Sequence, residues 1–321
     1  MILMVKRVAI VGAGVSGLTC AVIFAERGYR TAIFAEKIRQ RTTSGAAAAL
    51  WFPYDAEPAD KVIAWALETY NILVDLSRDS QTGVSMIELR QFSRTNEIPI
   101  PDWAHSLGAR RIVISGEVEE SRIFTSGFAI SVPLMDTTIY LDYLASRFLA
   151  AGGKINPNVR FDGLCDVDRA FELVINCAGI GARELVDDAD LEPHRGQVAI
   201  VSKIDNLTCA IVCDDEPLMY AIPRANDCVF GGTNELSDKP DVDPAVTARI
   251  VTECSRVLNI ENPKVLTARV GLRPFRKSGV RLEGNELRDG RKVIHNYGHG
   301  GAGFTLSWGC AREVVDLIPP R

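Results

Sequence analysis

Residues 6–37 read KRVAIVGAGVSGLTCAVIFAERGYRTAIFAEK, and this stretch decides the fold. Gly12, Gly14 and Gly17 form G-x-G-x-x-G directly after an apolar run, and an amphipathic segment and a second apolar run follow. This order predicts a strand, a tight turn and a helix whose first backbone N–H groups bind a phosphate. Glu36, at the end of the second run, lies where an acid accepts a hydrogen bond from a ribose hydroxyl. The stretch predicts a dinucleotide site without indicating which dinucleotide.

Length and charge narrow the class of protein. A chain of 321 residues with 47% hydrophobic residues is long enough for two packed domains. A net charge of −5 argues against nucleic acid or an anionic membrane as partner, because both require a basic surface. The apolar start Met1–Val5 is too short for a signal peptide, and no apolar run is long enough to span a membrane. We therefore expect a cytoplasmic protein.

The cysteines and histidines do not indicate a metal site. The 8 cysteines form no C-x-x-C pair, and several lie in apolar runs, so we expect buried free thiols. His295 and His299 have a spacing that suits a metal on a helix, but they fall across a glycine-rich turn. We expect no zinc there.

Periodicity predicts helices and strands in an order typical of an interrupted α/β domain. Helices are expected at Lys61–Asp79 after a cap at Asp60, at Thr138–Ala151 after Asp136, and from Pro244 to Leu258 after Asp243. Residues 84–132 and 196–232 contain successive short strands without helices between them, which favours an antiparallel sheet. The run LVINCA at Leu173–Ala178 is apolar on both faces and predicts a central parallel strand.

The last segment contains a second glycine turn. Gly298, Gly300 and Gly303 repeat G-x-G-x-x-G, but the chain ends too soon afterwards for another strand and acid. We therefore expect the following helix to face another part of the same cofactor rather than a second nucleotide. If that cofactor is a flavin, the positive end of the helix stabilises negative charge on the reduced ring.

Taken together, the chain resembles the D-amino-acid oxidase family, which includes the D-aspartate oxidases. The shared motifs are VGAGVSGL at 11–18, TTSGAAAALWFPY at 42–54, VINCAG at 174–179, RGQV at 195–198, VGLRPFR at 270–276 and HNYGHGGAGFTLSWG at 295–309. The resemblance implies non-covalently bound FAD, a D-amino acid and molecular oxygen as substrates, and hydrogen peroxide as a product.

The resemblance also implies an α/β fold with a Rossmann-like FAD-binding domain and an inserted, mainly antiparallel β-sheet domain for the substrate. We expect the FAD-binding domain to comprise residues 1–55, 133–190 and 265–321. The substrate domain then comprises residues 56–132 and 191–264. The sequence leaves open whether the protein forms a homodimer.

Roles transfer residue by residue onto the matching motifs. The resemblance implies that Arg273 binds the substrate carboxylate, that Tyr220 donates a hydrogen bond to it, and that the Gly301 carbonyl accepts from the substrate amine. A guanidinium suits this role because it pairs bidentately with a carboxylate and stays charged in a dry pocket. The residues expected to bind the cofactor are Gly12, Gly14, Val15, Ser16, Gly17, Glu36, Lys37, Thr42, Thr43, Ser44, Ala49, Leu50, Trp51, Val159, Ala178, Gly179, Gly300, Gly301, Gly303, Phe304 and Thr305.

Departures from the family pattern bear on the choice of substrate. Phe52, Met219 and Ile222 are expected to form an apolar pocket wall. Asn234 stands where the aspartate-specific relatives carry a basic residue, so neutral side chains are favoured over acidic ones. The loop Cys213–Met219 is short, and the sequence leaves open whether it acts as a lid. The chain does not end in the peroxisomal S-K-L.

Other functions stay open at this stage. An oxidase for glycine or sarcosine, a D-aspartate oxidase, a catalytically silent flavin-binding protein and an NAD-dependent dehydrogenase all use a related glycine turn. For a D-amino-acid oxidase, no catalytic histidine or aspartate is expected. A substrate that arrives as the free amine needs only to be positioned for hydride transfer from Cα to flavin N5.

Overall fold

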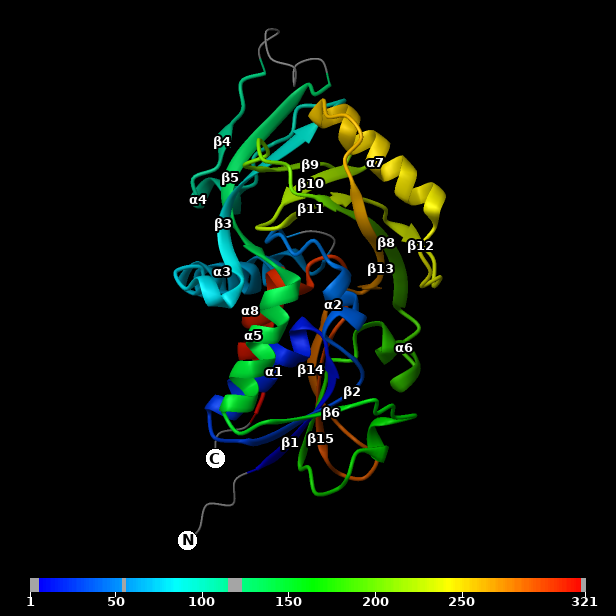
Figure 1. The fold of residues 1–321 in the computed structure, drawn as a ribbon. Helices are drawn as coiled ribbons and strands as arrows, with labels where there is room; N and C mark the ends of the chain where they lie inside the picture. The colour runs from blue at the N-terminus through cyan, green and yellow to red at the C-terminus, as the bar shows by residue number, and fades with distance from the viewer. Residues whose placement is uncertain (1–5, 54–55, 115–122, 319–321) are drawn as a thin grey trace.

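The computed structural model describes residues 6–53, 56–114 and 123–318. The expectations for Met1–Val5, for Tyr54 in the second motif and for the last three residues lie outside this part of the chain. Within it, a parallel sheet with helices forms one end of an elongated molecule, and a mainly antiparallel sheet forms the other (Figure 1). None of the described helices combines the length and apolar character needed to cross a bilayer.

The parallel sheet contains the first glycine turn. Its strand order is β14-β15-β7-β1-β2-β6, with β1 parallel to both β7 and β2, and only β14 runs antiparallel to its neighbour. All four residues of β7 are buried, which confirms the predicted central strand. The strands are β1 Arg7–Ala13, β2 Arg30–Ile38, β6 Lys154–Pro157, β7 Leu173–Asn176, β14 Arg281–Glu286 and β15 Lys292–Tyr297.

Helices α1, α5 and α8 pack together beside this sheet (Figure 1). The sequence predicted an amphipathic α1, but every residue from Gly17 to Ala25 is buried, because neighbouring elements cover all its faces. The cap of α5 is confirmed, since the Asp136 side chain accepts from the Thr138 N–H at 2.9 Å. The helices here are α1 Val15–Glu26, α2 Thr43–Ala46, α5 Thr137–Ala150, α6 Ala182–Leu185 and α8 Gly303–Asp316.

Helix α3 (Ala59–Leu76) packs against α8 and differs from its prediction at both ends. Asp60 lies in the first turn and its side chain does not cap the helix. The N-cap residue is Pro58, whose extended backbone leads directly into the helix. The helix ends at Leu76 rather than at Asp79, whose side chain instead accepts from the Gln81 N–H.

The second sheet has the order β12-β8-β11-β10-β9-β3-β5-β4, and β13 also pairs with β8. It is antiparallel except for the parallel pair β3 and β9. Its strands are β3 Val84–Ser93, β4 Arg110–Arg111, β5 Ser126–Met135, β8 Leu191–Ser202, β9 Ala210–Cys213, β10 Met219–Pro223, β11 Asp227–Gly231, β12 Glu235–Leu236 and β13 Val265–Arg276.

Helix α7 (Pro244–Leu258) covers this sheet, and short helix α4 spans Asp102–Ser106 (Figure 1). The predicted cap of α7 is confirmed, because Asp243 accepts from the Ala245 N–H at 2.8 Å. Strand β13 pairs antiparallel with β8, although the sequence placed its residues with the cofactor domain. The domain limits given above stay a prediction.

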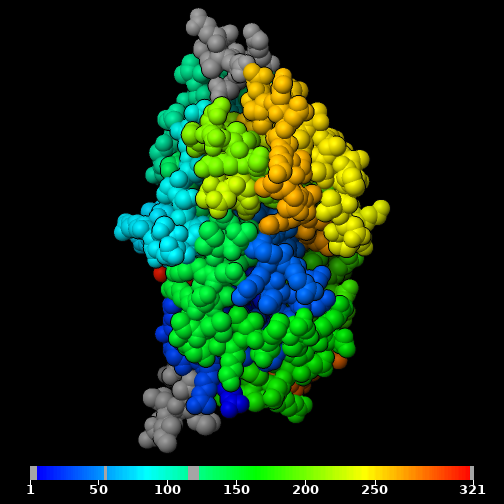
Figure 2. All heavy atoms as spheres, in the orientation of Figure 1, coloured from blue at the N-terminus to red at the C-terminus, as the bar shows by residue number. Residues whose placement is uncertain are grey.

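The cysteines are free, as expected, and all but Cys165 are buried. Strand β13 and helix α2 lie in contact near the junction of the two halves of the molecule. Strand β13 runs toward the parallel sheet, and α2 packs against it. Figure 2 shows the blue segment that contains α2 at the surface, where the two halves meet. The site therefore lies between the sheets.

Candidate active site

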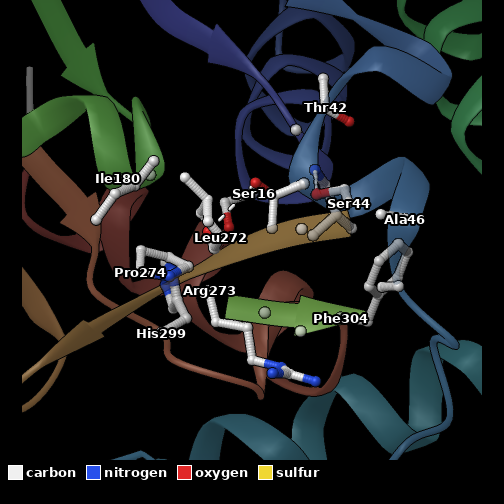
Figure 3. A pocket seen from close by; sticks show the side chains of 18 of the residues that line it. Ser16, Thr42, Ser44, Ala46, Ile180, Leu272, Arg273, Pro274, His299 and Phe304 are labelled. Carbon is white, nitrogen blue, oxygen red and sulfur yellow. Dashed lines mark hydrogen bonds between the residues drawn. The ribbon is translucent and has the colours of Figure 1, made fainter. Parts of the chain in front are cut away.

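A single large cavity, about 870 Å³ in volume, collects most of the predicted site residues. Its walls come from the β1–α1 turn, the end of β2, the segment 40–50, strands β9, β10 and β13, and the turn before α8. In Figure 3, Ser16 and Ser44 lie near one another on one side, and His299 and Arg273 lie on the other. One continuous space thus joins the two ends of the site.

The glycine turn after β1 packs its backbone closely against Cys177. Because glycine has no side chain, the turn leaves space for a ligand. Gly12 has φ +111°, and a Cβ there would lie 2.3 Å from the Cys177 carbonyl oxygen. Gly14, Val15 and Ser16 line the cavity, and the Val15 N–H donates to Ser44 Oγ at 3.0 Å. This arrangement matches a phosphate site at a helix N-terminus.

Gly17 does not line the cavity, in contrast to the prediction. A Cβ at Gly17 would lie 2.0 Å from the Gly12 carbonyl oxygen, so this glycine lets α1 pack against the turn. The close approach of α1 at Gly17 helps to shape the turn that lines the cavity. The third glycine of this motif, here Gly17, allows close packing between the helix and the strand.

The far end of the cavity is polar and contains the predicted ribose acid. Glu36 and Lys37 line it at the end of β2, as does Val159, whose N–H donates to the Ala35 carbonyl at 3.1 Å. Arg160, which the sequence analysis missed, lies 3.7 Å from Glu36. Further lining residues that had no motif to mark them are Phe161, Asp162 and Glu184.

The hydroxyl cluster after β2 enters the cavity through a single helical turn. Thr42 Oγ1 accepts from the Gly45 N–H at 3.1 Å and so caps α2, and Thr43 Oγ1 donates to the Leu272 carbonyl at 3.3 Å. Both threonines line the cavity together with Ser44, and Ala49 and Leu50 follow them along the wall. These five predicted cofactor-binding residues therefore line the same cavity.

Trp51 is the member of this segment that does not line the cavity. Its side chain is fully buried, and its indole N–H donates to the Ala66 carbonyl at 3.0 Å. The indole ring packs edge-on against Tyr70 and Trp103. Trp51 therefore supports the cavity wall from behind, and half-buried Phe52 lines the cavity.

The second glycine turn forms the middle of the cavity. Gly300, Gly301, Gly303 and Phe304 line it at the start of α8, opposite Ala178 and Gly179 after β7. Thr305 does not line it. Its hydroxyl donates to the Phe52 carbonyl at 3.0 Å and accepts from the Phe52 N–H at 3.1 Å, so it fixes the backbone of Phe52.

The other end of the cavity contains the predicted anion-binding pair. Arg273 Nη1 donates to the Thr233 carbonyl at 2.9 Å and lies 3.4 Å from Asn234 Oδ1. A Cβ at Gly196 would lie 2.5 Å from the guanidinium, so this glycine makes room for it. Burial raises the pKa of Tyr220, and the nearby Arg273 charge opposes this shift. Tyr220 is therefore a neutral donor beside a cation.

Strand β10 corrects one pocket prediction. Tyr220 and Ile222 line the cavity, but Met219 is fully buried on the opposite face, where it packs with Phe92 and Phe230. The reason is the two-residue period of a strand, which sends neighbouring side chains to opposite faces. Residues that the sequence analysis missed on this wall are Leu89, Gln91, Val212, Asp214 and Leu218.

Two histidines lie at or near the second glycine turn and are neutral. His299 lines the cavity, and its Nε2 is 3.0 Å from Asn296 Oδ1. His295 Nδ1 is 3.2 Å from Asn176 Nδ2. Burial is the main reason that the pKa of each imidazole falls to about 4. The motif HNYGHGG contains both residues, but its letters do not reveal their burial.

A nucleotide cradle that is continuous with a cationic, phenolic pocket defines a dinucleotide-dependent oxidoreductase. The family of FAD-dependent oxidoreductases matches residues 7–317, and the chain belongs to this family. FAD is therefore its cofactor, and the close-packed Gly12 turn and the polar end at Glu36 fit the pyrophosphate and ribose of FAD.

Similar proteins agree over nearly the whole chain. The D-amino-acid oxidase of Streptomyces coelicolor is 40% identical over 318 residues, covering 97% of this chain and 96% of that protein. The D-amino-acid oxidase of Rubrobacter xylanophilus is 37% identical, covering 98% and 96%. The D-aspartate oxidase of Homo sapiens is 30% identical, covering 97% and 94%. The glycine oxidase structure from Geobacillus kaustophilus shares the fold, with a TM-score of 0.82 at 19% identity, covering 97% and 94%.

Proposed function

We propose that this protein is an FAD-dependent D-amino-acid oxidase. It converts a D-amino acid, molecular oxygen and water into a 2-oxo acid, ammonia and hydrogen peroxide, with water hydrolysing the imino acid that hydride removal leaves. The observation that carries the proposal is that Arg273 and Tyr220 line the same cavity as the FAD cradle. Relatives named D-amino-acid oxidase at 34–40% identity support the same activity.

The chain's own groups bind and orient the substrate. Arg273 pairs with the carboxylate, and the neutral Tyr220 hydroxyl donates a second hydrogen bond to it. The Gly301 carbonyl accepts from the substrate amine. Bound FAD supplies the acceptor for the hydride that leaves Cα. With the carboxylate fixed at Arg273, only one configuration directs its Cα–H toward the flavin, so geometry selects the D-enantiomer.

No lining side chain has to act as an acid or base if the substrate arrives as the free amine. His299 does not supply a positive charge at neutral pH, because burial lowers its pKa to about 4. The chemistry therefore depends on position and on exclusion of water. The wall formed by β3, β9 and β10 then determines which substrate side chains are accepted.

The pocket favours neutral side chains over acidic ones. Asn234 contributes an amide beside Arg273, and none of the described residues of β3, β9 and β10 that line the cavity is a cation. An acidic side chain at that wall would have no partner. The cytoplasmic location stays a prediction from the sequence, and a homodimer and a lid role for the loop Cys213–Met219 stay open.

Anaerobic flavin reduction tests the proposal. The purified holoenzyme is mixed with D-alanine, D-methionine or D-phenylalanine, and the loss of visible flavin absorbance is recorded against the L-enantiomers. We expect reduction by the D-forms only, and peroxide after oxygen is admitted. Faster reduction by glycine or sarcosine would assign the protein to that substrate class, and faster reduction by D-aspartate would overturn the neutral preference. No reduction by any D-amino acid would contradict the proposal.

A further inference from the structure

Three neighbouring strands form a wall that extends from the carboxylate end of the cavity. The register pairs Tyr220 on β10 with Val212 on β9, and Val212 with Gln91 on β3. All three residues line the cavity. Because neighbouring strands lie about 4.8 Å apart, Gln91 is about 10 Å from Tyr220 across the sheet. A substrate held near Tyr220 therefore extends its side chain over Val212 toward Gln91.

A carboxylate lies at the end of this wall. Asp214 directly follows β9, and its Oδ2 accepts from Gln91 Nε2 at 2.8 Å. Gln91 is 94% buried, so its amide holds the carboxylate from the protein side. Asp214 itself lines the cavity. Among the described residues, no donor is bonded to its Oδ1 and no cation forms an ion pair with it.

The Asp214 side chain is exposed to solvent, and other acids of the molecule have more protein partners. Asp215, the next residue, accepts from Ser93 Oγ at 2.7 Å and from the Arg94 N–H at 2.6 Å, which fixes the loop. Asp188 pairs with Arg276 at 2.9 Å. Asp214 has only the Gln91 amide, and burial raises its pKa. A cation supplied by the ligand would stabilise the charged form.

We propose that Asp214, positioned by Gln91, selects D-amino acids whose side chains carry a positive charge over neutral side chains of equal length. The inference rests on the proposed oxidase function. Arg273 binds the carboxylate at one end of the substrate region, and Asp214 receives the side-chain cation at the other. Val212, Leu218 and Leu89 line the space between and suit a methylene chain.

The test compares D-lysine with D-norleucine, which has the same carbon chain without the terminal amine. Values of kcat/KM are measured for the wild-type holoenzyme, for Asp214→Asn and for Glu216→Gln. Glu216 is the matched control, because it is an exposed acid two positions further along that does not line the cavity. We expect the lysine-to-norleucine ratio to fall at least about tenfold in Asp214→Asn, since a hydrogen bond to a charged group is lost. Glu216→Gln keeps the wild-type ratio.

A conservative variant separates charge from folding. Asp214→Glu retains the preference for D-lysine if the carboxylate is the cause, even if Asp214→Asn loses flavin. An unchanged ratio in Asp214→Asn would overturn the inference, and so would an equal loss for both substrates, which would place Asp214 at the shared α-amine. Oxidation of D-norleucine by the wild type checks the oxidase function separately, so its failure is not confused with failure of the Asp214 assignment.

Discussion

Arg273 is a cation whose side-chain hydrogen-bond partners, within the part of the chain that the structure describes, are neutral. Its guanidinium lies across Gly196 and donates to the Thr233 carbonyl, and among the described residues no carboxylate forms an ion pair with it. A neutral carbonyl fixes the direction of the side chain but does not compensate its charge. We therefore expect the Arg273 charge to bind an anionic ligand.

Replacing Arg273 tests whether its charge binds the substrate carboxylate. Arg273→Ala should lower kcat/KM for D-alanine by at least about thirtyfold, because loss of a charge-assisted pair with a carboxylate costs about 2–5 kcal/mol. Arg273→Lys should recover only part of this, since an ammonium does not form the bidentate pair. The visible flavin spectrum serves as the control and should not change. Steady-state kinetics that match the wild type would refute the role.

At the scale of elements, the β1–α1 turn depends on a backbone that leaves no room for a side chain. Gly12→Ala places a Cβ 2.3 Å from the Cys177 carbonyl oxygen and forces an alanine to φ +111°. We expect FAD to bind at least about tenfold more weakly and the apoprotein to lose about 1–3 kcal/mol of stability. Quenching of flavin fluorescence measures the affinity.

The matched control for that turn is Gly284→Ala on β14. A Cβ at Gly284 would meet no atom within 4 Å, and its φ is not positive. This variant should bind FAD as the wild type does. Equal affinities for Gly12→Ala and the wild type would show that the turn does not shape the phosphate site.

Strand β15 contributes a pH dependence of stability. Burial lowers the pKa of His295 to about 4, from an ordinary value of 6.5. Below pH 6.5 the unfolded chain binds a proton that the folded protein excludes, so the free energy of unfolding falls as the pH drops toward 4. Between pH 6.5 and 5 this loss amounts to about 2 kcal/mol.

Urea unfolding at pH 7 and pH 5 measures that loss. His295→Gln should reduce the difference between the two pH values by about 2 kcal/mol. His105→Gln replaces an exposed histidine and should leave the difference unchanged. If both variants show the wild-type difference, His295 does not cause the pH dependence.

For the whole molecule, the sequence predicted those parts of the site that belong to motifs with fixed residue spacing. Glu36 near the end of β2, Arg273 of β13 and the glycines of both turns are found directly from motifs, and all of these except Gly17 and Gly298 line the cavity. No motif in the sequence predicts which strands pair. Gln91 and Asp214 lie 123 positions apart and meet only because β3 pairs with β9. The sequence analysis therefore missed the side-chain end of the pocket.

Within the motifs, several residues expected at the site lie outside the cavity lining for a similar reason. Trp51 and Thr305 lie in the family motifs, but neither lines the cavity, because each supports Phe52 or its wall from behind. Met219 was misplaced although the alternation on β10 was available as a signal. A motif identifies a segment, whereas packing decides which of its side chains reach the ligand.

FAD should act on the stability of both halves, because residues of the parallel and antiparallel sheets line one cavity. A ligand that binds only the folded state adds about 2.7 kcal/mol at 100 times its Kd. We expect apoprotein titrated with FAD to show one unfolding transition whose Tm rises by several degrees with FAD concentration. Differential scanning calorimetry records it, with Gly12→Ala shifting less at equal FAD. If FAD raised only one of two separate transitions, the halves would unfold independently and the shared cavity would not couple them.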